Sequence, residues 1–462
     1  MIFTDSVFLV FFAVIFVLYW AVRVRTAQNV LLLVGSYVFY GWIHPWFCIL
    51  IAVSTVVDYT VGLAIYRHRS RAKLFLTISL VTNLGMLGFF KYFNFFAENV
   101  QNLASGVGMQ MDPITLQIFL PVGISFYTFQ TLSYTIDIYR RQMEPRTNFI
   151  DFALFVSFFP QLVAGPIERA QRFLPQIESV RRWRGELLYS AWPLIVMGYL
   201  KKVVIADNVA VFVNKVYMLE QPSLLLLVSG TLAFTVQIFA DFSAYTDLAR
   251  GFARLLGFDL VVNFNAPYLA ISPSDFWRRW HISFSSWIRD YLYIPLGGSR
   301  VDSNLKFLFV TVTAMGLSGL WHGAAWHYVA WGVYHALLVF IYHRLGKGGR
   351  WQPSGIANRV VAWAVMFLAT NIGWMLFRAP SMGWLLNAVG GGDLGLSGDS
   401  LTASVSILGM VLLYSLPLMA LPLLERVDQR VPYLRPVYYA VAVSAVIVFL
   451  GTGGQDFIYF QF

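Results

Sequence analysis

Residues 46–66, WFCILIAVSTVVDYTVGLAIY, decide the fold class of this chain. The stretch is apolar almost throughout. A helix that crosses a hydrocarbon core of about 30 Å needs about twenty mainly apolar residues, so this stretch has the length of a membrane-spanning helix. Similar apolar segments lie at residues 7–22, 74–96, 116–139, 224–248, 305–321, 326–342, 360–377, 405–424 and 437–450.

The composition agrees with a membrane protein over the whole chain. Of 462 residues, 58% are hydrophobic and only 12% are charged, whereas soluble globular proteins carry about a quarter charged residues. Lipid offers no partner to unpaired backbone groups, and no alternating pattern of barrel strands appears, so the spans are expected to be helices. The sequence therefore predicts an all-α polytopic fold of about eleven to twelve spans, in a single membrane-embedded domain over residues 1–462.

The net charge of +10 does not indicate a nucleic-acid partner, because the basic residues form no single patch. They fall in short clusters between apolar spans, which is the pattern of cytoplasmic loops. The loops at residues 98–113 and 379–401 are poor in Lys and Arg, so they are expected to face outward, as are both termini. The clusters expected in the cytoplasm lie at Arg23 and Arg25 and at residues 67–73, 140–146, 169–184, 250–254, 344–350 and 426–435.

Two apolar segments differ from simple spanning helices. Residues 149–164 lie between two basic clusters and hold Pro160, and the helix-breaking pair of Gly165 and Pro166 follows them. We expect this segment to enter the membrane and return, or to lie in the interface. Residues 192–213 carry charged side chains (Lys201, Lys202 and Asp207), which predicts a broken or cavity-facing helix. Such segments are tolerated inside protein or beside a water-filled cavity, so an internal chamber is expected.

The longest polar stretch, residues 272–300, interleaves charges with aromatics: SPSDFWRRWHISFSSWIRDYLYIPLGGSR. Its aromatic residues recur at three- and four-residue steps, the period of one helical face. One interpretation is an interfacial amphipathic helix with Arg residues at the head groups. The other is a basic cytoplasmic groove for a phosphorylated donor such as coenzyme A. Arg278, Arg279 and Arg289 fit either.

Two histidines are candidates for chemistry. His281 lies within this polar stretch, and His322 lies in GLSGLWHGAAWHYVAWG, at a glycine-rich break between apolar spans. Ionisable residues at membrane depth are costly and are functional candidates by default. Histidine suits acyl transfer because it can accept a hydroxyl proton at neutral pH and donate one to a leaving thiolate. A histidine with apolar neighbours is more often structural, which we expect of His327 and His335.

A metal site is not expected. His322, His327, His335 and His343 are close in sequence, and the last three keep roughly one helical face. No cysteine or acidic ligand lies near them, and hydrophobic spacing accounts for the segment. The single cysteine, Cys48, lies in an apolar run and is expected to be a small buried hydrophobe.

Three carboxylates also lie within apolar segments, at Asp137, Asp241 and Asp247. They can pair with Lys or Arg, or line a proton or substrate path. We favour pairing.

Several segments together resemble one family, the membrane-bound O-acyltransferases, and within it the bacterial branch that includes the membrane subunit of alginate O-acetyltransferase. The resemblance runs nearly end to end and is highly specific, although W-H-G alone would be weak. The segments that carry it are LPVGISFYTFQTLSYTIDIYRR, FFPQLVAGPIER, QIFADFSAYTDLARG, DFWRRWHISFSSWIRDYLYIPLGG, GLWHGAAW and the terminal FIYFQF.

The resemblance implies a helical fold in which a cytoplasmic donor funnel meets an outward acceptor chamber. It maps the family histidine onto His322, and a second signature position, which is Asn in many eukaryotic members, onto His281. It implies acetyl-CoA as donor substrate, no permanently bound cofactor, contact with membrane lipid, and a multi-pass location in the bacterial inner membrane.

By the same resemblance, the chain takes an acyl group, most simply acetyl, from a cytoplasmic thioester and passes it outward. The acceptor would be an exopolysaccharide such as alginate or another cell-envelope glycan, reached directly or through an extracytoplasmic esterase-like (SGNH) acetyltransferase partner. His322 would act as general base, and His281 would orient or stabilise charge. The polymer, the acyl group, an acyl-enzyme, the partner and the oligomeric state stay open.

Two alternatives remain at this point. A D-alanyl transferase of teichoic-acid type shares the architecture but uses a carrier-protein thioester. A secondary transporter or flippase would also need broken helices and buried charges. Acyl transfer or thioester hydrolysis by purified protein separates the classes, because a transporter would catalyse neither.

Overall fold

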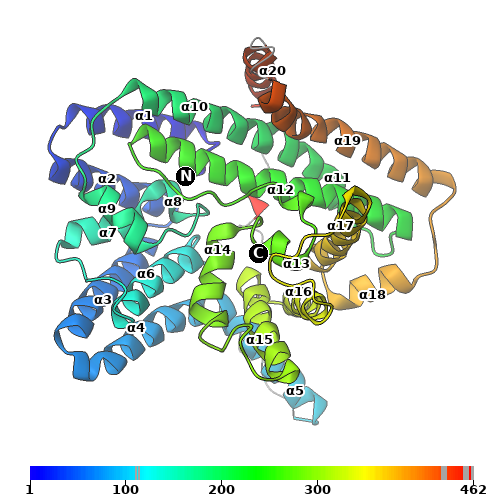
Figure 1. Cartoon of the computed structure of the whole chain (residues 1–462), viewed down its shortest axis with the longest axis horizontal. Coiled ribbons are helices and arrows are strands. Elements are labelled where there is room, and N and C mark those ends of the chain that lie inside the picture. Colours follow the sequence, from blue (N-terminus) through cyan, green and yellow to red (C-terminus); the bar gives the residue numbers. More distant parts are fainter. Residues whose placement is uncertain (110–111, 113–114, 428–433, 451–456, 459–462) are drawn as a thin grey trace. The chain divides into compact units, whose positions relative to one another are not determined.

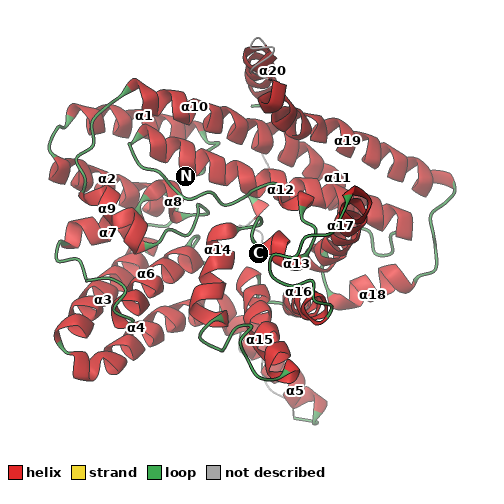
Figure 2. Cartoon of the chain, viewed as in Figure 1, coloured by secondary structure: helices red, strands yellow, loops and turns green. Residues whose placement is uncertain are grey.

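The computed structural model describes residues 1–462 apart from 110–111, 113–114, 428–433, 451–456 and 459–462, with the backbone alone for residues 421–427. Every regular element in the described part is a helix (Figure 2). The all-α prediction is therefore confirmed. The basic cluster at 426–435 and the terminal FIYFQF segment lie largely outside the described residues.

The described chain forms two compact units. The first comprises residues 1–191 and 249–261, and the second comprises residues 192–248 and 262–462. The main helices of the first unit are α1 (Ser6–Ala21), α2 (Arg25–Gly41), α3 (Phe47–Arg67), α4 (Ala72–Leu87), α5 (Phe93–Gly106), α6 (Ile124–Tyr139), α7 (Phe149–Ser157), α8 (Phe159–Leu162) and α9 (Ala170–Glu178).

The second unit is also helical. Two helices have residues in both units, because the boundaries between the units fall inside them: α10 (Gly185–Tyr199) and α12 (Leu224–Leu255). The other helices are α11 (Asp207–Tyr217), α13 (Pro273–Trp277), α14 (Ile282–Ile288), α15 (Asn304–His322), α16 (Trp326–Arg344), α17 (Ile356–Arg378), α18 (Met382–Gly390), α19 (Gly398–Val427) and α20 (Leu434–Phe449).

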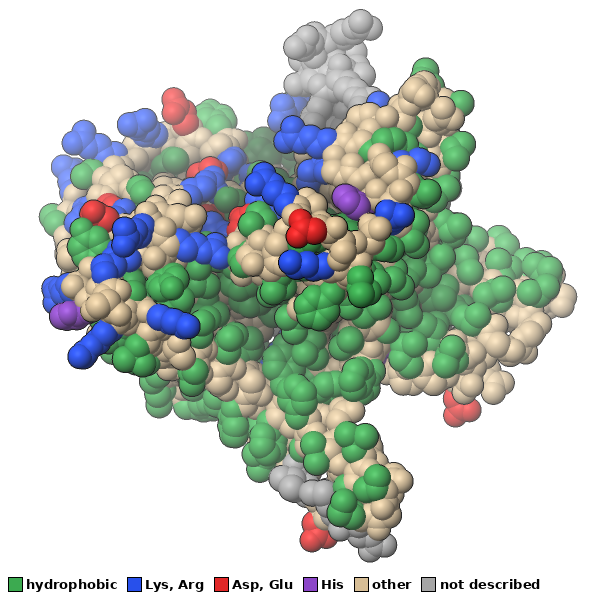
Figure 3. Space-filling view, turned by 60° about the horizontal axis from the view of Figure 1, so that its bottom comes forward, with side chains coloured by type: hydrophobic (Ala, Val, Ile, Leu, Met, Phe, Trp, Pro, Cys, Tyr) green, Lys and Arg blue, Asp and Glu red, His purple; other side chains and the backbone are tan. Residues whose placement is uncertain are grey.

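Six helices in the described residues are long and apolar enough to cross a membrane, and two shorter apolar helices, α1 and α20, accompany them. Hydrophobic side chains cover much of the surface in the space-filling view (Figure 3). Such a surface would be costly in water but suits contact with lipid. The six spans run over Phe47–Arg67, Arg69–Gly106, Leu224–Leu255, Asn304–His322, Ile356–Arg378 and Gly398–Ala420.

The apolar stretch at residues 46–66 forms most of α3, which packs beside α4 and α6 (Figure 1). Its one carboxylate, Asp58, is fully buried, and it accepts hydrogen bonds from Ser79 Oγ at 2.5 Å and Asn83 Nδ2 at 2.8 Å, both on α4. Ser54 Oγ donates in turn to Asn83 Oδ1 at 2.7 Å. An apolar helix thus buries a polar group because its neighbour supplies the donors.

Two expected boundaries are wrong. Residues 116–139 are not one span, because the helix begins only at Ile124, after Pro121 and the left-handed Gly123. A side chain at Gly123 would lie 2.5 Å from the carbonyl oxygen of Leu162, so only glycine fits there. The expected outer loop at 98–113 is also partly helical, since α5 continues to Gly106.

The predicted break in residues 149–164 is confirmed. Helix α7 ends at Ser157 and α8 starts at Phe159, whose amide donates to Ser36 Oγ at 3.1 Å. A side chain at Gly165 would come within 2.4 Å of Gln161 Cα, so the chain folds tightly after α8. The path of this segment through the membrane stays a prediction.

Residues 192–213 are continuous rather than broken. Helix α10 passes through a π-helical segment, Leu200–Ala206, into α11. The expected pairing of Asp241 and Asp247 is confirmed: Lys201 Nζ lies 2.7 Å from Asp247 Oδ2, and Lys202 Nζ lies 3.1 Å from Asp241 Oδ1. Asp137 accepts a hydrogen bond from Gln171 Nε2 at 3.1 Å.

Helices α15 and α16 form an antiparallel pair whose backbones touch. A side chain at Gly319 would lie 2.1 Å from the carbonyl oxygen of Tyr328, and one at Gly332 would lie 2.2 Å from that of Met315. Small residues allow such an approach between apolar helices. This contact fixes the turn that follows His322, the last residue of α15.

We predict that Gly319→Ala destabilises the protein by about 1–3 kcal/mol, because the new methyl group overlaps the backbone of α16. Gly316→Ala is the matched control on the same helix, since nothing lies within 4 Å of its added carbon. Thermal unfolding of both variants in detergent tests this. Equal midpoints for Gly319→Ala and the unaltered protein would refute the close contact.

Candidate active site

His322 lies in a box of aromatic rings in the second unit. Its side chain is 4% exposed. The ring centroid lies 4.9 Å from Trp321, 5.2 Å from Trp331, 5.3 Å from Phe377 and 5.7 Å from Phe284, each with the planes close to perpendicular. Edge-to-face rings position an imidazole by packing, so its orientation is set from α14, α15, α16 and α17 together.

His281 lies just before α14 and is fully buried. Its backbone is left-handed, with φ at +43°, a conformation that non-glycine residues rarely adopt. The amide of the next residue, Ile282, donates to the carbonyl oxygen of Asn263 at 2.9 Å, which holds the turn. Strained backbone of this kind persists where surrounding contacts impose it, and it is common at functional sites.

The side chain of Asn263 fixes the tautomer of His281. Asn263 Oδ1 accepts from the amide of Ser283 at 3.1 Å and from Ser283 Oγ at 2.9 Å, and it lies 3.2 Å from His281 Nδ1. The amide oxygen of an asparagine carries no hydrogen, so it can only accept a hydrogen bond from the ring. The Nδ1 atom of His281 therefore carries the proton. In the neutral ring of His281, Nε2 is then the nitrogen that can accept a hydrogen bond.

The environment keeps His281 neutral. Burial lowers the pKa of His281 from 6.5 to about 3, because the charged ring would lose its water. The rings of Phe242, at 4.7 Å, and Phe284, at 5.0 Å, lie beside it. His281 is therefore uncharged at physiological pH.

The two histidines share a pair of aromatic neighbours. Phe284 and Trp321 are stacked on each other at 4.2 Å, and each contacts both imidazole rings. The structure thus brings together His281 and His322, which are distant in sequence. The residues of α14, of α15 and of the connection between these helices separate the two histidines along the chain. The shared contacts with Phe284 and Trp321 nevertheless place both histidines at one site.

The three predicted arginines do not form one cluster in contact with these histidines. Arg278 and Arg279 share the carboxylate of Asp275, at 3.4 Å and 3.0 Å. Arg278 also donates to the carbonyl oxygen of Gly349 at 2.7 Å. Arg289 lies 2.8 Å from Asp290, with its side chain 60% exposed. Because two guanidinium groups share one carboxylate, a positive charge remains at Arg278 and Arg279.

The next histidines along the chain have different surroundings. His335 is 1% exposed, and its ring stacks on Phe276 at 6.0 Å. A side chain at Gly373 of α17 would lie 2.8 Å from its Nε2. His327 packs on Tyr328 at 4.1 Å. These contacts suit the structural role predicted for both. No group of three metal-ligating side chains occurs among the residues that the structure describes.

The end of the described chain lies beside the same site. The amide of Ile458 donates to Asp241 Oδ2 on α12 at 2.7 Å. The ring of Phe457 packs on Tyr245 at 4.7 Å and on Phe242 at 6.2 Å. Phe242 in turn contacts His281. This contact and Asn263 were both missed by reasoning from the sequence.

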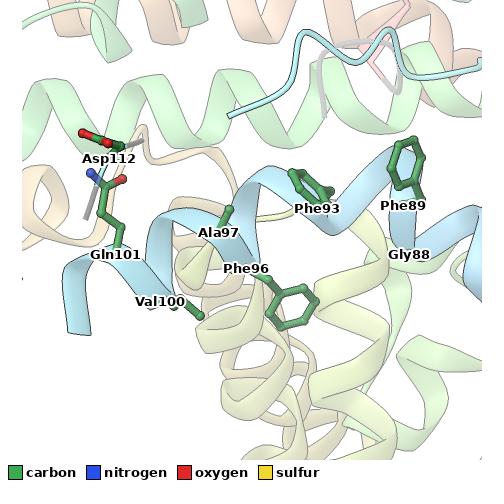
Figure 4. Close-up of a pocket in the computed structure, with 8 residues that line it drawn as sticks. All are labelled: Gly88, Phe89, Phe93, Phe96, Ala97, Val100, Gln101 and Asp112. Atoms are coloured by element: carbon green, nitrogen blue, oxygen red, sulfur yellow. The ribbon is translucent and has the colours of Figure 1, made fainter. Parts of the chain in front are cut away.

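An apolar pocket of about 510 Å³ lies elsewhere, in the first unit on α5 and the π-helical turn before it (Figure 4). Its walls include Phe89, Phe93 and Phe96, with Gln101 and Asp112 at one end. It contains none of the predicted site residues.

Comparison with known proteins identifies the family of this chain. The model of MBOAT, the membrane-bound O-acyltransferase family, matches residues 72–377, a range that includes both histidines. The chain belongs to this family. It is therefore a multi-pass membrane acyltransferase, and its reaction requires an acyl donor.

Three relatives differ in how much of the chain they match. "Probable alginate O-acetylase" of Pseudomonas aeruginosa is 40% identical over 83% of this chain and 73% of the relative. "Peptidoglycan O-acetyltransferase" of Helicobacter pylori is 33% identical over 80% and 74%. "Teichoic acid D-alanyltransferase" of Bacillus subtilis is 27% identical over 55% and 68%.

We predict that Asn263→Ala destabilises the protein by about 1–3 kcal/mol, because it leaves the buried donors of Ser283 and His281 without their acceptor. Asn265→Ala is the control, since its side chain is exposed two residues away. Thermal unfolding measures the difference. An Asn263→Ala variant as stable as the Asn265→Ala control would contradict the network.

Proposed function

We propose that this chain transfers an acetyl group from a cytoplasmic thioester to a hydroxyl on the outer side of the membrane, for O-acetylation of a cell-envelope polysaccharide. The observation that carries the proposal is the pair of buried histidines that share Phe284 and Trp321. The names of the alginate and peptidoglycan relatives support acetyl as the acyl group.

The proposed reaction needs one general base, which takes the proton of the acceptor hydroxyl. The hydroxyl oxygen of the acceptor attacks the thioester carbonyl, and His322 takes the hydroxyl proton. The carbon–sulfur bond then breaks, and His322 returns the proton to the leaving thiolate. The rings of Trp331 and Phe377 limit water around His322, which protects the thioester from hydrolysis. His281 orients the reacting groups through Nε2.

We propose acetyl-CoA as the donor, with Arg278, Arg279 and Arg289 at its phosphates. Guanidinium groups bind phosphate with two parallel hydrogen bonds. The positive charge that remains around Asp275 supports this role for Arg278 and Arg279. The interfacial-helix interpretation of residues 272–300 remains the alternative, and the exposure of Arg289 fits it equally.

The remaining assignments extend the same proposal. The chain acts as one functional domain in the bacterial inner membrane, with basic loops in the cytoplasm and a chamber around the histidines. An extracytoplasmic esterase-like partner passes the acetyl group to the polymer. Alginate and peptidoglycan are the polymers that the relatives' names mention. D-alanyl transfer is the second candidate, and the narrower match to that relative favours it less.

We predict that His322→Ala and His322→Gln lower acyl transfer by about a hundredfold to ten-thousandfold, the usual contribution of a general base. His322→Gln nearly preserves the side-chain volume inside the aromatic box, so it separates chemistry from packing. His327→Ala is the control on the following helix. Transfer of labelled acetyl to polymer, at matched membrane abundance, is the measurement.

Two outcomes would count against this role. Normal polymer acetylation by both His322 variants would refute the proposed mechanism. A loss that tracked membrane abundance alone would leave His322 as a structural histidine.

We predict that charge reversal of Arg278, Arg279 and Arg289 together raises the Michaelis constant for acetyl-CoA by about tenfold or more, because charge-assisted contacts to phosphate are lost. Arg359→Glu is the control, because this exposed arginine begins α17 away from the polar stretch. Steady-state kinetics with varied donor concentration test the change. An unaltered constant in the triple variant would leave only the interfacial-helix interpretation.

A further inference from the structure

A basic pocket lies in the first unit, and none of the candidate catalytic residues lines it. It has a volume of about 460 Å³ and is formed by the connection between α9 and α10 together with Gly257. Three of its lining residues are arginines, Arg181, Arg182 and Arg184. None of them has an ion-pair partner among the residues that the structure describes.

Arg181 is the buried arginine among the residues that line this pocket. It is 6% exposed, and it donates to Tyr19 Oη at 2.6 Å, to the carbonyl oxygen of Ile177 at 2.8 Å and to Asn29 Oδ1. All of these acceptors are neutral. The guanidinium is therefore fixed in place while its charge is not cancelled by direct contact with a carboxylate.

Nearby carboxylates are already engaged by other arginines. Glu178 Oε1 lies 2.5 Å from Arg146 Nε, and Asp151 Oδ2 lies 3.6 Å from Arg25 Nη1. Arg182 and Arg184 are exposed at the rim. The pocket therefore has two exposed arginines, Arg182 and Arg184, together with the buried charge of Arg181, and this combination favours an anion.

The surroundings of the pocket are those of a membrane interface. Trp183, between the two exposed arginines, is 45% exposed and packs edge-on against Phe16 at 5.4 Å and Trp20 at 5.5 Å. Trp20 lies at the end of the apolar helix α1. Tryptophans that flank an apolar helix beside arginines are typical of the head-group level.

Exposed apolar side chains lie in the pocket or close to its residues in the sequence. Val180 is 64% exposed, Leu188 is 49% exposed and Tyr189 is 76% exposed. A soluble anion would gain nothing from these side chains. A ligand with both a phosphate and acyl chains would cover them and fill the basic pocket at the same time.

We propose that this pocket binds the phosphate head group of an anionic phospholipid, with its acyl chains against Val180, Leu188 and the Trp183 ring. The charge of the pocket complements the phosphate, and basic pockets at membrane surfaces recognise head groups in this way. The site is independent of the acyl-transfer proposal, because binding needs no turnover.

The test uses the full chain, purified and delipidated in detergent. Native mass spectrometry measures binding of phosphatidylglycerol, phosphatidylcholine and free coenzyme A. We expect preferential retention of phosphatidylglycerol. The double variant Arg182→Gln with Arg184→Gln should weaken it roughly thirtyfold, since each basic residue near the surface contributes about fivefold.

Two further variants sharpen the result. Arg67→Gln with Arg71→Gln removes the same charge from exposed arginines of the first unit, and it should change binding by less than about threefold. Arg182→Lys with Arg184→Lys keeps the charge and should keep most of the binding. Thermal unfolding checks that all variants fold, and Arg181 is left unaltered because it holds the loop.

Several outcomes would overturn the proposal. Equal weakening in the Arg67 and Arg71 variant would mean diffuse attraction to negative lipid. Equal retention of phosphatidylcholine would mean that the net negative charge of the head group is not recognised. Competition by coenzyme A, lost with Arg182 and Arg184, would make the pocket a site for a soluble phosphate donor instead.

Discussion

The absence of water around most of this chain is the constraint on which its structure depends. A polar group inside an apolar helix must find its partner in the chain itself, because lipid supplies none. Asp58 meets Ser79 and Asn83 on the neighbouring helix. Lys202 lies between Asp207, at 2.8 Å, and Asp241. The contacts of Asp58 with α4 and of Lys202 with Asp241 on α12 each hold one helix against another. Such polar contacts specify which helix faces meet, which apolar surface alone would not do.

Hydropathy therefore predicts much of the fold but not its interruptions. It identifies spans such as α3 and α17 because transfer into lipid depends on composition over about twenty residues. It overextends the segment before α6, where Pro121 and Gly123 set the backbone, because apolar content carries no information on φ. The lack of Lys and Arg in residues 98–113 bears on which side a loop faces and not on whether α5 continues into it.

The candidate site is predictable only in part. An ionisable residue in apolar sequence is unusual, so His281 and His322 can be found by inspection. Their neighbours cannot. Phe377 reaches His322 from α17, and Asn263 reaches His281 from a connection before α13, with no local pattern that links either pair. The positive φ of His281 is equally hidden, because it follows from hydrogen bonds to Asn263 rather than from the residue type.

The network around Asn263 bears on how the two histidines divide their roles in the proposed mechanism. A general base works best when its pKa lies near the working pH. Burial lowers the pKa of His281 to about 3, so this ring is a weak base at neutral pH. Its fixed tautomer nevertheless gives Nε2 a constant lone pair, which can accept a hydrogen bond from a hydroxyl without taking its proton. The electrostatics therefore disfavour His281 as the general base, and an orienting role for this ring is consistent with the proposal that leaves proton transfer to His322.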